Sequence, residues 1–422
     1  MLIAPTRTEP TDPGVPPAPG RHAGATGATS RPGTDHGKNT DVEVLRAAAI
    51  LFTLAAHWGH GWLGSLGSVG RTIQSWTAFA TGVDLFFCIS GFVIADSLLR
   101  QPIPPFSAAG FKVWVSAFWV RRAFRLLPSA WFWIAITLAA TAFILDTTPD
   151  GRLTVRTWVD TAYAMLNVIN LHYIACTPAH TCGTLGVYWS LSLEEQFYLV
   201  LPTLLFLVRS RTAIIVLLAV LCTVQLALPR VNGFLADGSS LWFIRTDAII
   251  LGVLIAYWRQ TASYGRWDPR LLSSRTLGTL AALAGLAGLA VVTSPRADAG
   301  WGTSAAALCS ALLVWIASYD RDYLMAPGRL KTVMLWFGSR SYALYLIHML
   351  VLAVCYELTR RALGRPLTQV SPVYGVAMIA ATAAITFAAA EFNYRVIESP
   401  LRARGRRIAA GIESRARARA AG

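Results

Sequence analysis

An arginine and a histidine stand eleven positions apart in an otherwise apolar stretch of the chain, Leu45 to His60. Eleven residues make about three turns of an α-helix, so Arg46 and His57 share one face and lie about 16 Å apart along its axis. Ionisable groups inside an apolar helix usually face a cavity and carry function. Because imidazole can take a proton near neutral pH, His57 is a candidate for acid–base chemistry. The alternative is structural, with Arg46 reaching lipid headgroups and His57 in a packing contact.

A carboxylate occurs in the next apolar segment. Asp84 lies among apolar residues, where an acid needs a partner or water. A position close enough to the membrane surface to be solvated would also explain it. The pair Ser90-Gly91, which follows in the same segment, is typical of close helix packing, where small residues are common.

Two further apolar segments carry polar side chains. Glu194 and Glu195 are adjacent, so they point about 100° apart on a helix and at most one should face an interior site. Spacing alone leaves open which one does. Tyr342, Tyr345 and His348 follow one another at intervals of three, which is roughly one helix stripe. Tyrosines there are also consistent with a position at the membrane interface.

The elements that must position these residues are membrane helices. Of the 422 residues, 55% are hydrophobic and 14% are charged, whereas soluble domains carry about 25% charged residues. Since a span needs about 20 mainly apolar residues, we predict an all-α, polytopic membrane helix bundle of about ten transmembrane helices. The predicted spans are 43–62, 79–99, 119–144, 190–208, 212–228, 240–258, 275–292, 303–318, 337–358 and 372–397.

The basic residues predict how the bundle lies in the cell membrane. With ten spans, clusters such as 121–125 and 209–211 fall on one side, together with both termini, and the positive-inside rule makes that side cytoplasmic. Counting 159–176 as a span would put the later clusters outside. We therefore interpret 145–189 as one outer loop with an amphipathic or re-entrant helix. The basic run 360–365 is an exception, because this topology places it outside.

The two ends of the chain differ in composition from the part between them. Residues 1–40 are rich in Pro, Gly, Thr and Ala and are predicted to form a disordered cytoplasmic tail that is not a signal peptide. Residues 41–402 form the predicted membrane domain, and 403–422 a basic cytoplasmic tail. The net charge of +15 follows the positive-inside pattern, so no nucleic-acid partner is expected. Cys176 and Cys182 lie in the outer loop, where oxidising conditions would allow a disulfide.

Five motifs in register give the chain a resemblance to a known family. They are Arg46 and His57 with ten residues between them, GVDLFFCISGF from Gly82, FWVRRAFRLLP from Phe118, WSLSLEEQFYLVLP from Trp189 and SYALYLIH from Ser341. In order and spacing, across about 41–402, they resemble the acyltransferase 3 family of integral membrane acyltransferases. The chain looks like the stand-alone form, without a following SGNH-hydrolase domain.

The resemblance implies an enzyme that transfers an acyl group, acetyl or another short one, from acyl-CoA to a hydroxyl of a carbohydrate or glycosylated acceptor. Acyl-CoA is then a donor substrate, and neither a bound cofactor nor a metal is expected. A hydroxyl becomes a good nucleophile as a base removes its proton, and His57 is the predicted base. A transient acyl-histidine is the alternative.

The other predicted site residues form a catalytic and a substrate-binding group. The catalytic group contains Asp84 or Glu194 to orient a catalytic side chain, and Tyr342 or Ser341 to donate to a developing oxyanion. The substrate-binding group contains Arg46, Arg121, Arg122 and Arg125 for the donor's phosphates, with Glu195, Ser341 and His348.

Three alternatives to this function stay open. Buried ionisable residues also mark ion pathways, so a small-solute transporter or channel is one, although no inverted internal repeat is visible. A non-catalytic membrane scaffold is another, and it would not need His57. Within the enzyme class, the acceptor could be a secondary metabolite such as a macrolide or its sugar.

Overall fold

The computed structural model describes residues 39–62, 67–228, 240–296, 300–364 and 372–421. In this part of the chain all regular structure is helical and no β-strand occurs, which confirms the all-α class. The predicted disordered tail, 1–40, lies outside the described residues except for its last two positions.

Each of the ten predicted spans coincides with a helix of the described chain. These helices are α1 (Thr40–Trp62), α3 (Gly82–Leu99), α4 (Ala108–Ala140), α7 (Tyr188–Val208), α8 (Arg211–Ala227), α9 (Asp247–Arg259), α10 (Arg275–Val291), α11 (Gly302–Ala317), α12 (Arg329–Leu363) and α13 (Pro372–Asn393). Shorter helices are α2 (Gly67–Trp76), α5 (Arg152–Met165) and α6 (Ile169–Cys176), and α14 (Ser399–Ala421) ends the described chain.

Length and apolarity support membrane insertion for part of this set. In the described residues five helices are long and apolar enough to cross a membrane: Phe79–Leu99, Ala108–Leu145, Tyr188–Val208, Arg329–Leu363 and Val373–Ala416. The helices α8, α10 and α11 are apolar but shorter. The chain is therefore a membrane protein, and a total of ten crossings stays a prediction.

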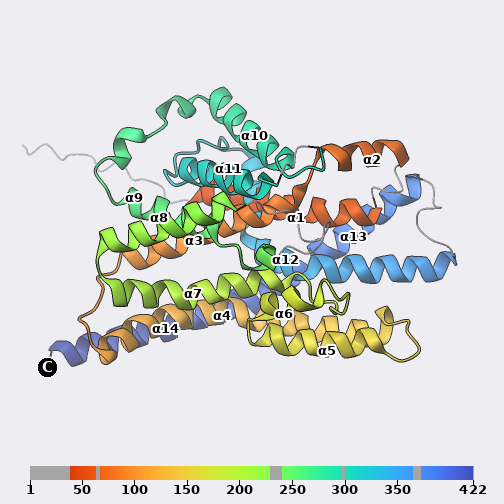
Figure 1. Ribbon diagram of the computed structural model, residues 1–422, viewed down its shortest axis with the longest axis horizontal. Helices are drawn as coiled ribbons and strands as arrows, with labels where there is room; N and C mark the ends of the chain where they lie inside the picture. Colours follow the sequence, from red (N-terminus) through yellow and green to blue (C-terminus); the bar gives the residue numbers. More distant parts are fainter. Residues whose placement is uncertain (1–38, 63–66, 229–239, 297–299, 365–371, 422) are drawn as a thin grey trace, which may run out of the picture. The chain divides into compact units, whose positions relative to one another are not determined.

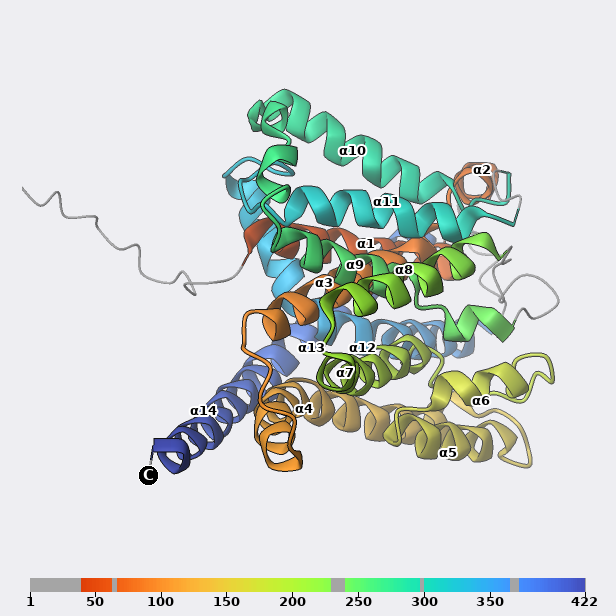
Figure 2. The ribbon, with the colours of Figure 1, turned by 60° about the vertical axis from the view of Figure 1, so that its left-hand side comes forward.

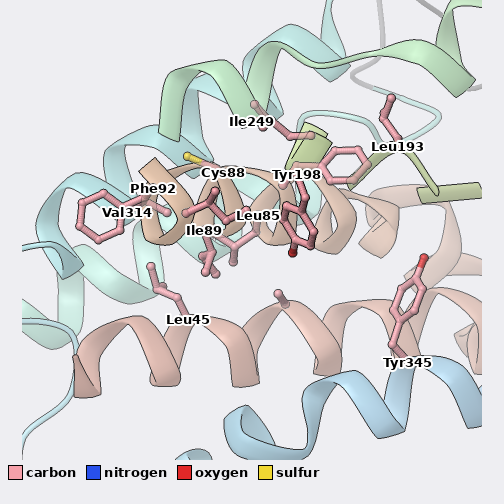
Figure 3. Close-up of a cluster of buried hydrophobic side chains, with 14 of the residues drawn as sticks. Leu45, Leu85, Cys88, Ile89, Phe92, Leu193, Tyr198, Ile249, Val314 and Tyr345 are labelled. Atoms are coloured by element: carbon pink, nitrogen blue, oxygen red, sulfur yellow. The ribbon is translucent and has the colours of Figure 1, made fainter. Parts of the chain in front are cut away.

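The central helices are packed from several sides. Figures 1 and 2 show α10 and α11 on one side of the bundle and α4 and α14 on the other, with α1, α3 and α9 between them. The helix α3 packs against α1, α9 and α11. Figure 3 shows Leu45 of α1 pointing toward Leu85 and Ile89 of α3, with Ile249 of α9 among the same buried side chains.

Two glycines allow α3 and α9 to come especially close. A Cβ atom at Gly91 would lie 2.0 Å from the carbonyl oxygen of Ile249, and one at Gly252 would lie 2.1 Å from that of Cys88. Neither position can carry a side chain without moving a backbone. The sequence pair Ser90-Gly91 thus includes the packing contact expected of it, made by the glycine.

The C-terminal helix runs along α4. Residues Tyr394–Glu398 form a π-helical turn that joins α13 to α14, and the predicted tail 403–422 is helical as far as Ala421. The α14 helix packs against α4. In both views α1 begins and α14 ends at the same end of the bundle (Figures 1 and 2), as an even number of crossings requires. Which side of the membrane this end faces is a prediction.

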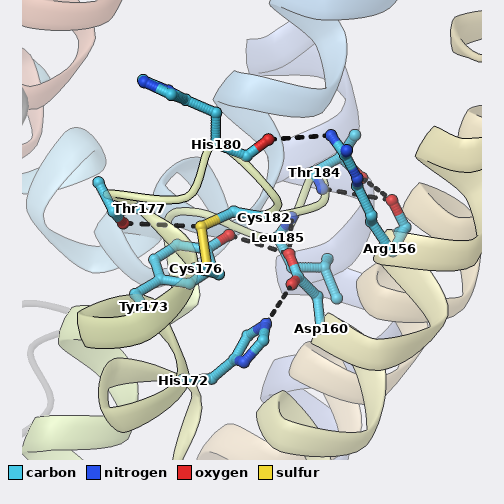
Figure 4. Close-up of a disulfide and its surroundings, with 11 residues drawn as sticks. Arg156, Asp160, His172, Tyr173, Cys176, Thr177, His180, Cys182, Thr184 and Leu185 are labelled. Atoms are coloured by element: carbon cyan, nitrogen blue, oxygen red, sulfur yellow. Dashed lines mark hydrogen bonds and ion pairs between the residues drawn. A yellow bond between two sulfur atoms is a disulfide. The ribbon is translucent and has the colours of Figure 1, made fainter.

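The predicted outer loop contains α5 and α6, and neither helix is long enough to cross a membrane. A disulfide joins Cys176 to Cys182 (Figure 4). Beside it, the fully buried Asp160 accepts hydrogen bonds from the Tyr173 hydroxyl at 2.9 Å and the Leu185 N–H at 3.3 Å. Burial raises the pKa of the Asp160 carboxyl, and its hydrogen bonds oppose that shift. The loop is thus tied together covalently and by a buried acid.

The arginines that break the positive-inside pattern are paired. Both Arg360 and Arg361 contact Glu357 one turn earlier in α12, at 2.8 Å and 2.7 Å. Part of the positive charge at this end of α12 is thereby neutralised. Arg365, the third residue of the exception, lies outside the described residues.

Candidate active site

The largest group of predicted site residues lines one cavity. This cavity of about 660 Å³, here called the arginine cavity, lies between α1, α3, α4, α7 and α12. Six predicted residues contribute to its lining: Arg46, Arg122, Arg125, Glu194, Ser341 and Tyr342. The helices thus bring together side chains that are far apart in sequence.

The arginines of this cavity are held by specific contacts. Arg46 forms an ion pair with Glu43, one turn earlier in α1, at 2.7 Å, and its side chain is 11% exposed. The guanidinium of Arg122 lies over the rings of Phe118 and Tyr198, at 5.6 Å and 5.3 Å from their centroids. Arg122 and Arg125 also have carboxylates nearby, since Glu194 lines the same cavity and attracts Arg122, and Glu398 attracts Arg125. The forked geometry of the guanidinium groups is what suits this wall to an anionic ligand.

Glu194 is fixed within the cavity by two hydroxyl donors. Ser90 donates to its Oε1 atom at 2.5 Å, and the Tyr198 hydroxyl donates to the same oxygen. Glu195 instead lines a smaller cavity of about 390 Å³, to which Glu194 and Tyr342 also contribute. Of the two adjacent acids, only Glu194 therefore reaches the arginine cavity.

The hydroxyl of Tyr342 already donates a hydrogen bond to another group of the protein. The hydroxyl donates to the main-chain carbonyl oxygen of Leu126, at 2.8 Å. A tyrosine hydroxyl carries one proton. For Tyr342 to donate to an oxyanion, as predicted, this hydrogen bond would first have to break.

His57 lines a different cavity. This second cavity of about 630 Å³, here called the histidine cavity, is lined by Thr53, Ala56, His57, Ala80, Val83, Gly186, Val187, Trp189, Trp242, Tyr345 and Met349. Val83 and Tyr345 belong to the linings of both cavities. Arg46 and His57 thus face two compartments that adjoin at these two side chains.

His348 lies behind His57. Their ring centroids are 5.1 Å apart, and His348 is fully buried. The Nδ1 atom of His348 is 2.8 Å from the carbonyl oxygen of Tyr345 and 3.2 Å from that of Leu344. Since a carbonyl oxygen only accepts, Nδ1 carries a proton, and in the neutral form of the ring Nε2 would be an acceptor.

Asp84 lines neither of these cavities. It forms an ion pair with Arg245 at 3.2 Å, and both side chains are at most 2% exposed. The Arg245 guanidinium also lies over the Trp242 ring, 3.6 Å from its centroid, and Trp242 lines the histidine cavity. The pair thus stands one layer behind that cavity. The partner of Asp84 is a residue that the sequence analysis did not single out.

Arg121 also points away from the arginine cavity. Its side chain pairs with Glu413 of α14 at 2.6 Å. Positions 122 and 125 are three apart and share one face of α4, whereas position 121 lies about 100° from 122 around the axis. The basic motif of α4 therefore divides, with one arginine holding α14 and two facing the cavity.

Several polar residues near the predicted site were not predicted as members of it. They are Ser90, Ser190, Tyr198, Arg245 and Tyr345. For Tyr198 a signal existed, because it follows Glu194 by four positions and so lies on the same helix face. For Arg245 a signal existed as well, because it is an arginine inside the predicted span 240–258, but nothing in the sequence indicated its partner on α3.

Comparisons with known proteins identify the family of the chain. The family model described as "Acyltransferase domain", of the acyltransferase 3 type, matches residues 39–391. A protein named Peptidoglycan O-acetyltransferase OatA from Listeria monocytogenes is 25% identical over 387 residues, with 86% of this chain and 56% of that protein covered. O-acetyltransferase OatA from Staphylococcus aureus is 26% identical over 379 residues, covering 86% and 57%.

The chain thus spans about half the length of the curated relatives that it matches. No solved structure matches it significantly. The family match extends from the first described residue almost to the end of α13 and includes both cavities. The chain belongs to the acyltransferase 3 family.

Proposed function

We propose that this chain is a membrane O-acyltransferase that moves an acetyl or other short acyl group from acyl-CoA to a hydroxyl of a carbohydrate acceptor. The observation that carries the proposal is the adjacency of the two cavities, with three arginines in one and a histidine in the other. Family membership supports the reaction class. The names of the relatives support acetyl as the group and a cell-wall saccharide as the acceptor.

In this proposal the donor binds in the arginine cavity. Coenzyme A carries several phosphates, and Arg46, Arg122 and Arg125 supply guanidinium groups suited to them. The same cavity has apolar lining from Phe86 and Leu126, which suits the less polar arm that ends in the thioester. The acyl group would then lie toward Val83 and Tyr345, where the histidine cavity begins.

The acceptor hydroxyl reacts on the side of His57. The hydroxyl oxygen forms a bond to the acyl carbonyl carbon as the bond from that carbon to sulfur breaks. His57 takes the hydroxyl proton and returns a proton to the departing thiolate, so the products are an ester and free coenzyme A. His348 lies next to His57. Its contacts with two carbonyl oxygens fix the orientation of the His348 ring.

The test is direct transfer by the full chain in proteoliposomes. Radiolabelled acetyl-CoA and soluble peptidoglycan oligosaccharides are supplied, and the alkali-labile label on saccharide is measured. We expect transfer by the wild type and its loss in His57→Gln. His180→Asn is the matched control, because His180 is exposed in the outer loop and has a left-handed backbone that asparagine tolerates. Absence of transfer by the wild type to these saccharides, with the label staying on coenzyme A, would overturn the proposal.

A further inference from the structure

The two cavities are separated by a small set of contacts. Tyr345, which is 6% exposed, extends its hydroxyl to within 2.6 Å of the hydroxyl of Ser190, which is 4% exposed. The Phe86 ring packs edge-on against the Tyr345 ring, with centroids 6.1 Å apart. Val83 is the other residue that lines both cavities. We call Val83, Ser190 and Tyr345 the partition, and they come from α3, α7 and α12.

We propose that the partition selects the length of the acyl group that is transferred. This rests on the proposed function, in which a donor in the arginine cavity presents its acyl carbonyl to the side where His57 lies. An acetyl group brings one methyl beyond its carbonyl carbon to the partition. Every further methylene has to fit between the Val83 side chain and a tyrosine ring that is held by Ser190.

The degree of selection between acyl chains depends on the free energy of placing each additional methylene at the partition. One additional methylene in such a site changes reaction specificity by roughly 10–200-fold. The hydrogen bond between the hydroxyls of Tyr345 and Ser190 matters because it fixes the ring at the boundary of the two cavities. The partition forms and breaks no covalent bond. The carbon–sulfur bond of the donor breaks and the carbon–oxygen bond to the acceptor forms beside it.

Three substitutions change the partition in known directions. Val83→Ala removes two methyl groups and widens it, Val83→Ile adds one methyl group and narrows it, and Tyr345→Phe keeps the ring but releases it from Ser190. Val93→Ala is the matched control. Val93 lies on the same helix and is half-buried like Val83, but it lines only the arginine cavity.

The experiment compares kcat/KM for acetyl-, propionyl- and butyryl-CoA in proteoliposomes with one saccharide acceptor. We expect Val83→Ala to raise the butyryl-to-acetyl ratio about tenfold, Tyr345→Phe to raise it, and Val83→Ile to lower the propionyl-to-acetyl ratio. In Val93→Ala the ratios should equal those of the wild type.

Two results would overturn the inference while leaving the function intact. One is wild-type ratios in both Val83→Ala and Val83→Ile together with normal acetyl transfer. The other is an equal shift in Val93→Ala, which would make total cavity volume the determinant. Failure of the wild type to use any of the three donors would instead refute the proposed function. If Tyr345→Phe does not fold, the two Val83 variants decide alone.

Discussion

The imidazole rings of His57 and His348 lie with their centroids 5.1 Å apart, on α1 and α12. His57 is half-buried and lines the histidine cavity, whereas His348 is fully buried and bonded to carbonyl oxygens of its own helix. The two rings are therefore not equivalent. His57 is the one that lines the cavity, and His348 packs beside it.

Replacement of these two histidines should have different effects. We expect His57→Gln to lower kcat about 10²–10⁴-fold, the usual contribution of a general base. His348→Phe keeps a ring of similar size, so we expect a smaller loss of kcat and an altered pH–rate profile. Both variants should bind labelled acyl-CoA normally. A His57→Gln enzyme that retains more than roughly a tenth of wild-type kcat would exclude the base role.

The second prediction separates two roles of Arg46. If its guanidinium holds a donor phosphate, Arg46→Lys keeps the charge but loses the forked geometry, and the KM for acetyl-CoA should rise roughly tenfold or more. Glu43→Gln removes the ion-pair partner at 2.7 Å and should leave donor binding equal or tighter. The control is Arg152→Lys on α5, whose side chain is 73% exposed. An unchanged KM in Arg46→Lys would leave only the structural ion pair.

The third prediction concerns the buried pair of Asp84 and Arg245. Removing one partner of a buried ion pair costs about 3–5 kcal/mol, because the remaining charge loses a counter-charge that it has in the folded state. We therefore expect Asp84→Leu to lower the yield and thermal stability of the folded protein strongly. The double variant Asp84→Leu/Arg245→Met should regain most of both. Acyl transfer by the double variant then tests the predicted catalytic role: activity would refute it, and a folded but inactive enzyme would support it.

The disulfide between α6 and α7 gives a fourth prediction. Cys176 and Cys182 close a short ring, and loop entropy predicts a contribution of about 2 kcal/mol to the free energy of unfolding. Reducing agent should therefore lower the Tm of the wild type in detergent. It should have no effect on the Tm of the Cys176→Ser/Cys182→Ser variant. Cys355→Ser, at a position outside the disulfide, is the control and should respond to reductant like the wild type.

A fifth prediction uses the acid that precedes α5. Hydrogen bonds from Thr148 and Thr154 lower the pKa of the Asp146 carboxyl well below its usual range. Because the folded-state pKa lies below the unfolded value near 3.9, the ionised carboxylate stabilises the fold above about pH 4, and this contribution disappears as the pH falls through the folded-state pKa. Asp146→Asn should therefore lower Tm at pH 7, and its difference from the wild type should shrink in strong acid. The control is Asp150→Asn, in the same loop, which should change Tm little at either pH. A constant Tm difference between pH 7 and strong acid would contradict the assignment.

Sequence patterns predicted the helices well because apolar run length is a local property. The start of α9 is the case in which a predicted span began before its helix by several residues. The span was predicted to begin at residue 240, whereas the helix begins at Asp247 after a 3₁₀ turn over Ser240–Ile244. Arg245 lies between the two, and its side chain turns inward to Asp84. A boundary that depends on a partner 161 positions away has no signal in local composition.

The site was predicted in part for the same physical reason. The sequence analysis grouped Arg121 with Arg122 and Arg125, whereas Arg121 pairs with α14 and only the other two line the arginine cavity. Helical periodicity restricted the choice between Glu194 and Glu195 without making it. It placed Arg46 and His57 on one face but gave no sign that they line different cavities. Tyr345, which separates those cavities, comes from α12. Separation of this kind is a tertiary property, and no single helix contains it.

The glycine contact between α3 and α9 also has a mechanical meaning. At Gly91 and Gly252 each helix touches the backbone of the other, so even one methyl group would collide there. Because the backbones are in contact, α3 and α9 resist rotation and sliding against each other and should move as one rigid unit. Val83 lies on α3 and so belongs to this rigid unit, whereas Ser190 and Tyr345 lie on α7 and α12. If the two cavities become connected during turnover, α7 or α12 would then be expected to move while α3 and α9 stay in place.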